Sequence, residues 1–150
     1  MEKNWSGKIG LASDHAGFRL KEFIRLWLTD EGYQVVDFGC YSPESCDYPD
    51  FAHPLAIAVS EGTCTYGISL CGTGNGINMV VNKYPKIRSA LCWNREIASL
   101  ARRHNDANIL ALPARFLAPS EAQDIIGVFL NTGFEGGRHS IRIGKIPLNR

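Results

Sequence analysis

The sequence predicts a three-layer α/β/α Rossmann-like sandwich with a five-stranded parallel sheet. Short apolar runs rich in β-branched residues alternate along the chain with longer segments whose apolar residues recur at helical spacing. This alternation requires crossover connections, which place helices on both faces of a parallel sheet. The chain has 150 residues, enough for one domain with a substantial core, and it contains no internal repeat.

The first half of the chain supplies three of the expected strands. These strands are residues 8–13, 34–38 and 66–70, and the helices between them are residues 18–31 and 51–60. The first helix carries Leu20, Ile24 and Trp27 on one face, and Gly32 ends it. Residues 39–49 are rich in Ser, Pro, Asp and Gly, which indicates a loop.

The second half continues the alternation. Its expected strands are residues 88–92 and 108–112, and its expected helices are residues 77–82, residues 94–105 and a segment that begins at Pro119. Proline at the first position and Glu121 in the first turn are typical of a helix start. We expect residues 1–150 to form a single domain whose tail, residues 133–150, packs on a dimer.

Composition and charge exclude several classes of protein. The formal net charge is +1, so bulk electrostatics give no reason to expect nucleic acid or a membrane surface as partner. No run approaches the roughly 18–20 apolar residues of a membrane span, and the N-terminus lacks a signal-peptide pattern. The five cysteines form no CxxC pair and show no zinc-ligand spacing. We therefore expect a reduced, cytoplasmic protein whose cysteines mostly fill its core.

Cys71 is the expected exception among the cysteines. The loop Cys71-Gly72-Thr73-Gly74-Asn75-Gly76 follows a buried strand and precedes a helix, where parallel sheets bind ligands. Its glycines permit a tight turn that exposes N–H groups to a ligand, and these groups favour a thiolate. The spacing differs from the dinucleotide fingerprint, and Ile77 stands where a cysteine phosphatase needs arginine. The loop therefore indicates a base or nucleophile, with a tight turn that binds nothing as the alternative.

Two further places carry polar residues suited to a site. Asp14 and His15 close the first strand, where both are costly to bury unless they bind something. His104 lies on an otherwise apolar helical face, followed by Asn105 and a polar cluster. From the residues alone, a core histidine and a site histidine are equally consistent with this position.

Arginines near the end of the chain indicate an anion site. Arg138 and Arg142 share one face if their segment is helical, and a guanidinium group matches the oxygens of a phosphate. A solvated basic tail explains the same spacing equally well. Arg115, just after the fifth strand, is a third candidate for the same anion.

Taken together, these motifs resemble the ribose-5-phosphate isomerase B family, which includes the galactose-6-phosphate isomerase subunits. The matching segments, in family order, are Asp14-His15-Ala16-Gly17, Asp47-Tyr48-Pro49, the 71–76 loop, Asn82-Lys83, residues 103–108 and residues 135–139. The resemblance implies interconversion of ribose 5-phosphate and ribulose 5-phosphate through a cis-enediolate, a step of the pentose phosphate pathway. It also implies no metal or other cofactor, and a homodimer or a dimer of such dimers.

The resemblance further implies a role for each site residue. Cys71 would remove the C2 proton, His104 would open the furanose ring, and Thr73 with the loop N–H groups would stabilise the enediolate. The residues implied to bind the substrate are Asp14, His15, Tyr48, Gly72, Gly74, Asn75, Gly76, Asn105, Arg115, Arg138 and Arg142. One branch of the family has a glutamate base where this chain has Ile77, so Cys71 is the expected base. The family's interface site implies that Cys71 and His104 come from different subunits.

Two alternatives stand beside this interpretation. The same chemistry on a six-carbon sugar phosphate, such as allose 6-phosphate or galactose 6-phosphate, uses similar residues. Galactose-6-phosphate isomerases divide their site residues between two different subunits, whereas this chain carries a full set. A non-catalytic phosphate-binding module is the other alternative, but phosphate binding alone needs neither Cys71 nor His104.

Overall fold

The computed structural model describes residues 6–148 and contains one five-stranded sheet. The strands are β1 (Lys8–Ser13), β2 (Gln34–Asp37), β3 (Tyr66–Cys71), β4 (Ser89–Leu91) and β5 (Ile109–Pro113). They lie in the order β2-β1-β3-β5-β4, and every neighbouring pair is parallel. The predicted sheet is thereby confirmed. The chain changes direction across the sheet between β1 and β3, which is the switch point where such folds bind ligands.

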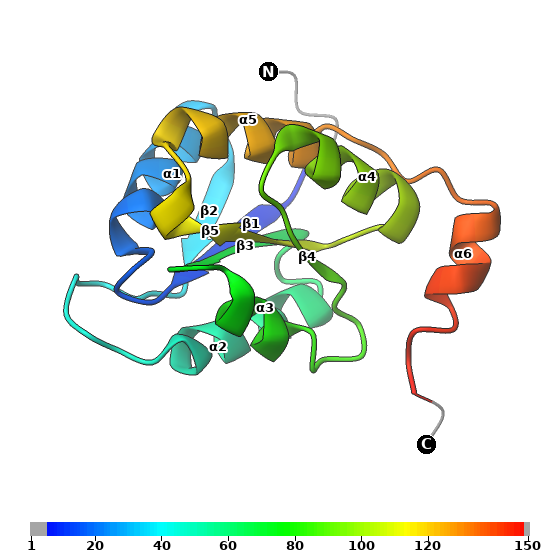
Figure 1. The fold of residues 1–150 in the computed structure, drawn as a ribbon, viewed down its shortest axis with the longest axis horizontal. Helices are drawn as coiled ribbons and strands as arrows, with labels where there is room; N and C mark the ends of the chain where they lie inside the picture. Colours follow the sequence, from blue (N-terminus) through cyan, green and yellow to red (C-terminus); the bar gives the residue numbers. More distant parts are fainter. Residues whose placement is uncertain (1–5, 149–150) are drawn as a thin grey trace.

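Helices cover both faces of the sheet. They are α1 (Phe18–Asp30), α2 (Tyr48–Ser60), α3 (Asn75–Val81), α4 (Arg95–Asn105), α5 (Pro119–Leu130) and α6 (Arg138–Ile143), with a 3₁₀ turn at Ala114–Phe116. In Figure 1, α1, α4 and α5 lie on one side of the sheet and α2 and α3 on the other. The short helix α6 stands apart from these layers, beyond the end of α4.

Two apolar cores fill the spaces between the layers. Because successive strand residues face opposite sides, Leu11 and Leu110 pack under α1 and α5, whereas Ala12 and Ile109 pack against α2 and α3. The strand glycine Gly10 allows close packing of α2, since a Cβ there would lie 2.5 Å from Leu55 Cδ1.

A fully buried lysine ties α1 to the sheet. The Nζ atom of Lys21 donates to both carboxylate oxygens of Asp37, at 2.9 and 2.8 Å, and to Glu22 at 3.1 Å. Asp37 also accepts the backbone N–H of Gly39 at 2.9 Å, so it holds the turn after β2. A buried ammonium group needs these partners because its desolvation is otherwise strongly unfavourable.

Some predicted boundaries were wrong. The helix expected at 51–60 begins at Tyr48, because Pro49 fits a first helical turn, where no backbone N–H is needed. The helix expected at 77–82 begins at Asn75, directly after Gly74 with φ of +76°. The tail forms α6 at Arg138–Ile143, which puts Arg138 and Arg142 one helical turn apart as the spacing predicted.

Candidate active site

The first part of the site is the turn after β1, beside the end of β3. The backbone N–H of Asp14 donates to the carbonyl of Leu70 at 3.3 Å, which joins the ends of the two strands. The Asp14 carboxylate accepts the N–H groups of Ala16 at 2.9 Å and Gly17 at 3.2 Å. These bonds satisfy one oxygen of a carboxylate that is only 7% exposed, and they fix its position at the carboxyl edge of the sheet.

His15 points toward the loop before α2. Its Nδ1 lies 3.2 Å from the backbone nitrogen and 3.3 Å from the carbonyl oxygen of Cys46, so the backbone of Cys46 holds the ring in place. Asp14, His15, Cys46 and Tyr48 line a pocket of about 680 Å³. The sequence indicated only a structural role for Cys46, whereas its backbone holds a site histidine and the residue lines the pocket. Burial, followed by the neighbouring Cys40 thiol, raises the pKa of Cys46.

Cys71 is the last residue of β3 and is nearly buried. It is 4% exposed and belongs to the core cluster that contains Ala12 and Ile77. Ile77 is fully buried in α3, which agrees with the view that it has no part in acid–base chemistry. The thiol therefore lies at the base of the 71–76 loop, between the sheet edge and α3.

The 71–76 loop receives side chains from two other elements. A Cβ on Gly76 would lie 2.5 Å from the Tyr48 ring, so the absence of a side chain lets Tyr48 lie over the loop. A Cβ on Gly72 would lie 3.1 Å from Nη1 of Arg115, and the backbone N–H of Arg115 donates to the Gly72 carbonyl at 3.1 Å. Within the loop, Thr73 Oγ1 accepts the N–H of Asn75 at 3.3 Å. The structure thus brings Tyr48 and Arg115 together at the glycine loop.

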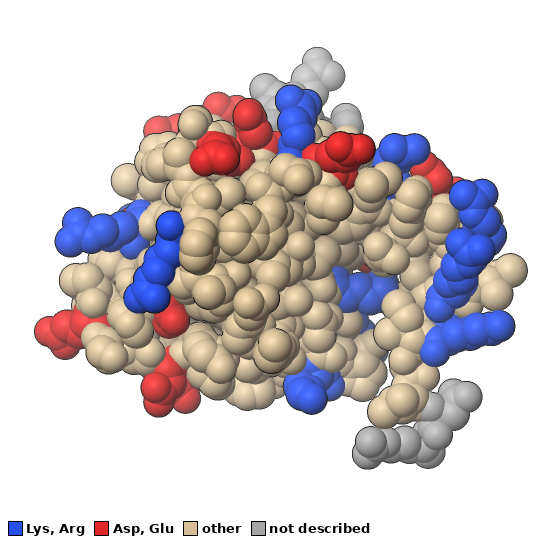
Figure 2. Space-filling model, in the orientation of Figure 1, with Lys and Arg blue, Asp and Glu red and all other residues tan. Residues whose placement is uncertain are grey.

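A second group of site residues lies around the end of α4. The His104 and His139 rings stack with centroids 4.3 Å apart, and with Asn105 and Arg142 they line a pocket of about 320 Å³. Figure 2 shows basic side chains along the α6 edge of the molecule, at the right of the view. The carbonyl of Asn105 accepts a hydrogen bond from Nε of Arg88 at 2.9 Å, and Arg88 lies just before β4. This second group therefore lies at the amino ends of the strands, which we call the amino edge of the sheet.

Two residues of this second group, Glu135 and His139, have shifted pKa values. The hydrogen bond from Arg103, with the charges of Arg103, His104 and His139, lowers the pKa of Glu135. Burial, followed by the charges of His104 and Arg138, lowers the pKa of His139. The cluster therefore favours a carboxylate beside a neutral His139 ring.

The two groups of site residues lie at opposite edges of the same sheet. Cys71 pairs in register with Pro113, whereas Ile109, four positions earlier in β5, follows closely after His104 and Asn105. At about 3.3 Å per residue, this separation is roughly 13 Å along the strand direction. The two pockets share no lining residue. Within one chain, Cys71 and His104 are therefore not brought together.

The remaining cysteines are free thiols, and most are buried. Cys40, Cys64 and Cys92 are all below 4% exposure, and burial raises the pKa of Cys92 to about 12. Such thiols pack as small apolar side chains, as the sequence analysis expected. Among residues 6–148, no helix is long and apolar enough to cross a membrane.

The fold and the two polar groups define a Rossmann-like α/β protein with a glycine-loop site at its switch point and a histidine–arginine site at the opposite edge. A family model described as Ribose/Galactose Isomerase matches residues 9–146, and the chain belongs to this family. It is 41% identical to ribose-5-phosphate isomerase B of Escherichia coli (strain K12) over 139 residues, which cover 93% of each chain.

Solved structures agree with this assignment. Ribose-5-phosphate isomerase B of Clostridium thermocellum is 50% identical, with a TM-score of 0.92 over 93% of this chain and 94% of that one. The Mycoplasma genitalium ribose-5-phosphate isomerase B, solved with bound ribulose 5-phosphate, is 43% identical with a TM-score of 0.90 over 95% of both chains.

Two residues of the histidine–arginine group had no role in the sequence analysis. Glu135 and His139 belong to the 135–139 segment that carried the resemblance, but nothing in their spacing shows that they meet His104. Glu135 is 31 positions from His104, and a long connection through α5 separates them. The sequence feature that could have pointed to Glu135 and His139 was their place in the 135–139 segment, which matches the family.

Proposed function

We propose that this protein is an aldose–ketose isomerase that interconverts D-ribose 5-phosphate and D-ribulose 5-phosphate. The observation that carries the proposal is the position of Cys71 at the end of β3, under a glycine loop on which Tyr48 and Arg115 converge. The relatives named ribose-5-phosphate isomerase B, including the one solved with ribulose 5-phosphate, support the same substrate. Five free thiols fit a reducing compartment, and we place the enzyme in the cytoplasm.

The proposed chemistry is a proton transfer between neighbouring carbons. Cys71, as thiolate, removes the proton from C2 of the open-chain aldose, and the C–H electron pair forms a cis-enediolate with its charge on O1. A proton then passes from O2 to O1, and the Cys71 thiol returns its proton to C1 to give the ketose. Thr73 and the N–H groups of the 71–76 loop stabilise the charge on the enediolate oxygens. Asp14 and Tyr48 hold the sugar hydroxyls, with help from Asn75. Nothing in this sequence of steps requires a redox group.

We infer that each active site is shared between two subunits of a homodimer. His104, as the group that opens the furanose ring, must reach the same substrate as Cys71, yet the two residues lie at opposite ends of strands whose register spans roughly 13 Å. A two-fold dimer supplies His104 and Asn105 from the partner subunit and creates two equivalent sites.

The phosphate would be held mainly by arginine. Arg138 and Arg142 lie one turn apart on α6, and Arg115 lies beside the glycine loop. Guanidinium groups donate paired N–H bonds to phosphate oxygens, which a lysine cannot do. His15 completes the set, because the Cys46 backbone holds its Nδ1 and leaves Nε2 to face an anion.

The test is formation of ribulose 5-phosphate from ribose 5-phosphate by the purified protein. Allose 6-phosphate and galactose 6-phosphate are assayed in parallel, and EDTA is included in a matched series. We expect the highest kcat/KM with ribose 5-phosphate and no loss with EDTA. A higher kcat/KM with a six-carbon sugar phosphate would reassign the substrate, and no turnover with any of them would refute the isomerase.

A further inference from the structure

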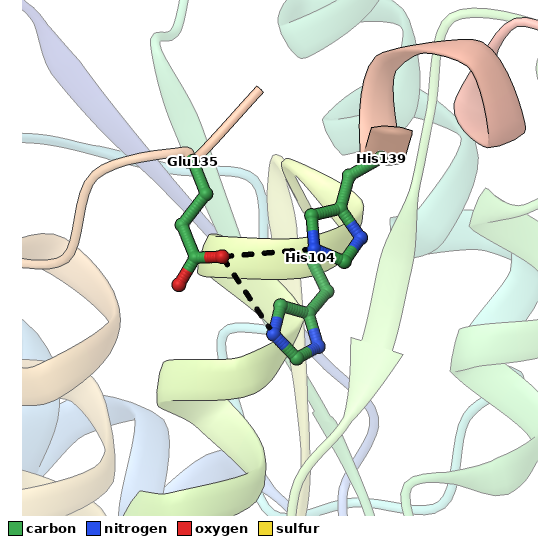
Figure 3. A group of neighbouring side chains, drawn as sticks. All are labelled: His104, Glu135 and His139. Carbon is green, nitrogen blue, oxygen red and sulfur yellow. Dashed lines mark ion pairs between the residues drawn. The ribbon is translucent and has the colours of Figure 1, made fainter. Parts of the chain in front are cut away.

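A histidine–glutamate–histidine cluster joins the end of α4 to the start of α6. His104 Nε2 lies 3.9 Å and His139 Nε2 lies 3.6 Å from the same atom, Oε2 of Glu135. Figure 3 shows that both rings direct a nitrogen toward this oxygen. These distances exceed those of hydrogen bonds, so three donor atoms converge on one small space without bonding one another.

His139 supplies an independent sign that a group is bound here. The residue is only 7% exposed, and its Nε2 is buried with no hydrogen-bond partner among residues 6–148. Leaving a buried polar nitrogen without a partner costs on the order of 1–3 kcal/mol. A group that accepts or shares this lone pair would remove that cost.

We propose that His104, Glu135 and His139 form a binding site for a divalent transition-metal ion of the Zn²⁺ type. Two imidazoles and one carboxylate are a common zinc donor set, and imidazole ligands favour zinc-like ions over Mg²⁺ and Ca²⁺. The three donor atoms all lie within 4.8 Å of one another. A central ion would then be within about 2.8 Å of each, so movements of less than about 1 Å would give zinc bond lengths. Because the two rings lie within 11° of parallel, the His104 ring must also rotate out of its stack on His139 for both lone pairs to point at one ion.

The surroundings of the cluster allow these movements. The guanidinium of Arg103 holds Oε1 of Glu135 at 2.7 Å, which leaves Oε2 directed at the histidines, as an outer contact orients a ligating carboxylate. His104 and Glu135 have side chains that are 37% and 39% exposed, so both can tilt toward an ion. The adjoining pocket of about 320 Å³ has room for a metal-bound water.

The nearby charges set the character of the site. Arg138 and Arg142 lie on the same short helix as His139, and their positive charges oppose a cation. The ion is therefore bound reversibly and not as a permanent part of the fold. The ion binds Nε2 of His104 and so inhibits opening of the furanose ring. The inhibition rests on the proposed function, whereas the binding of the ion does not.

The binding test uses the intact purified protein and the metal alone. Zn²⁺ followed by calorimetry, and Co²⁺ followed by visible absorption, should each fill one site per chain that EDTA empties, while Mg²⁺ gives no signal. Glu135→Gln and His139→Asn should each weaken Zn²⁺ binding at least about tenfold. His53→Asn, which removes an exposed histidine of α2, is the matched control and should bind as wild type does. Glu135 is partly exposed, so its variant tests the site even if His139→Asn does not fold.

A rival site lies at Cys46, beside His15. Thiolate ligation there would give Co²⁺ an intense near-ultraviolet band, which ligation by histidine and glutamate lacks. Zn²⁺ binding that is lost in Cys46→Ser and kept in Glu135→Gln would overturn the proposal, as would the absence of saturable Zn²⁺ binding.

The activity test separates this inference from the proposed function. Zn²⁺ should inhibit ribose 5-phosphate isomerisation, and Glu135→Gln should need at least about tenfold more Zn²⁺ for half inhibition, relative to its own metal-free rate. A protein that binds Zn²⁺ without isomerase activity refutes the function alone. An active isomerase that binds no Zn²⁺ refutes the metal site alone.

Discussion

Mixing two inactive variants tests whether the active site is shared between subunits. Cys71→Ala removes the proposed base at the carboxyl edge of the sheet, and His104→Ala removes the proposed ring-opening group at the amino edge. The roughly 13 Å between these edges along the strands is too great for one C2 proton and one ring oxygen of a pentose to be reached from the same chain. Each variant alone should therefore be inactive, but for a different reason.

The expected recovery follows from counting sites. When equal amounts of the two variants exchange subunits freely, about half of the dimers are mixed. In a shared-site dimer, each mixed dimer has one site that lacks both groups and one site that is intact. Half of the dimers with one of two sites active gives roughly a quarter of the wild-type activity. If both groups act within one chain, every site lacks one of them and no activity returns.

The assay is ribulose 5-phosphate formation before and after mixing, at constant total protein. Subunit exchange is measured separately by mass spectrometry of differently tagged chains. Exchange without recovered activity would refute the shared site and leave the isomerase assignment intact. Mixing each variant with more of itself is the control, and it should recover nothing.

Four further outcomes are expected. Cys71→Ala should abolish deuterium wash-in at C2 while calorimetric substrate affinity stays within about tenfold; substantial residual isomerisation would remove the thiol from its role. Arg142→Ala should raise KM for ribose 5-phosphate by about 10- to 150-fold, the equivalent of roughly 1.5–3 kcal/mol, and an equal loss with unphosphorylated ribose would contradict this. Asp37→Asn should lower the free energy of unfolding by about 3 kcal/mol in urea, because the buried Lys21 ammonium loses the charge of its closer carboxylate and keeps only Glu22, and an unchanged midpoint would disprove that account. Since His139 has a folded pKa below its ordinary 6.5, the unfolded state binds more protons, so stability should fall as the pH drops below 6.5; His139→Asn should flatten this dependence, and an identical pH profile would count against it.

The fold was largely predictable because apolar periodicity reports directly which side chains face the core. The five strands and the helices on both faces follow from that pattern. The strand order does not, because a helical crossover is long enough to place β4 either beside β3 or beyond β5. The start of α2 was missed because Pro49 marks both loops and first helical turns.

The two halves of the site differed in how far the sequence could predict them. Asp14 follows β1 and Cys71 ends β3, and these strands pair directly, so the rule that ligands bind at the carboxyl ends of strands predicts their proximity. Tyr48 and Arg115 reach the same loop only because Gly76 and Gly72 lack side chains, which the glycine spacing allowed but did not specify. The meeting of His104 with Glu135 depends on the path of the chain after α5, and no local pattern encodes it.

The position of α6 connects the proposed dimer with the proposed chemistry. Within residues 6–148, this helix carries Arg138 and Arg142 beyond the end of α4, far from the glycine loop that holds Cys71. Ile141 is 66% and Ile146 59% exposed, so apolar side chains accompany the arginines on the surface. A second subunit that covers these side chains would bring its own carboxyl edge against the arginines. On this argument a single chain holds the base in one place and two of its phosphate ligands, Arg138 and Arg142, in another, and isomerisation depends on the same contact that holds the dimer together.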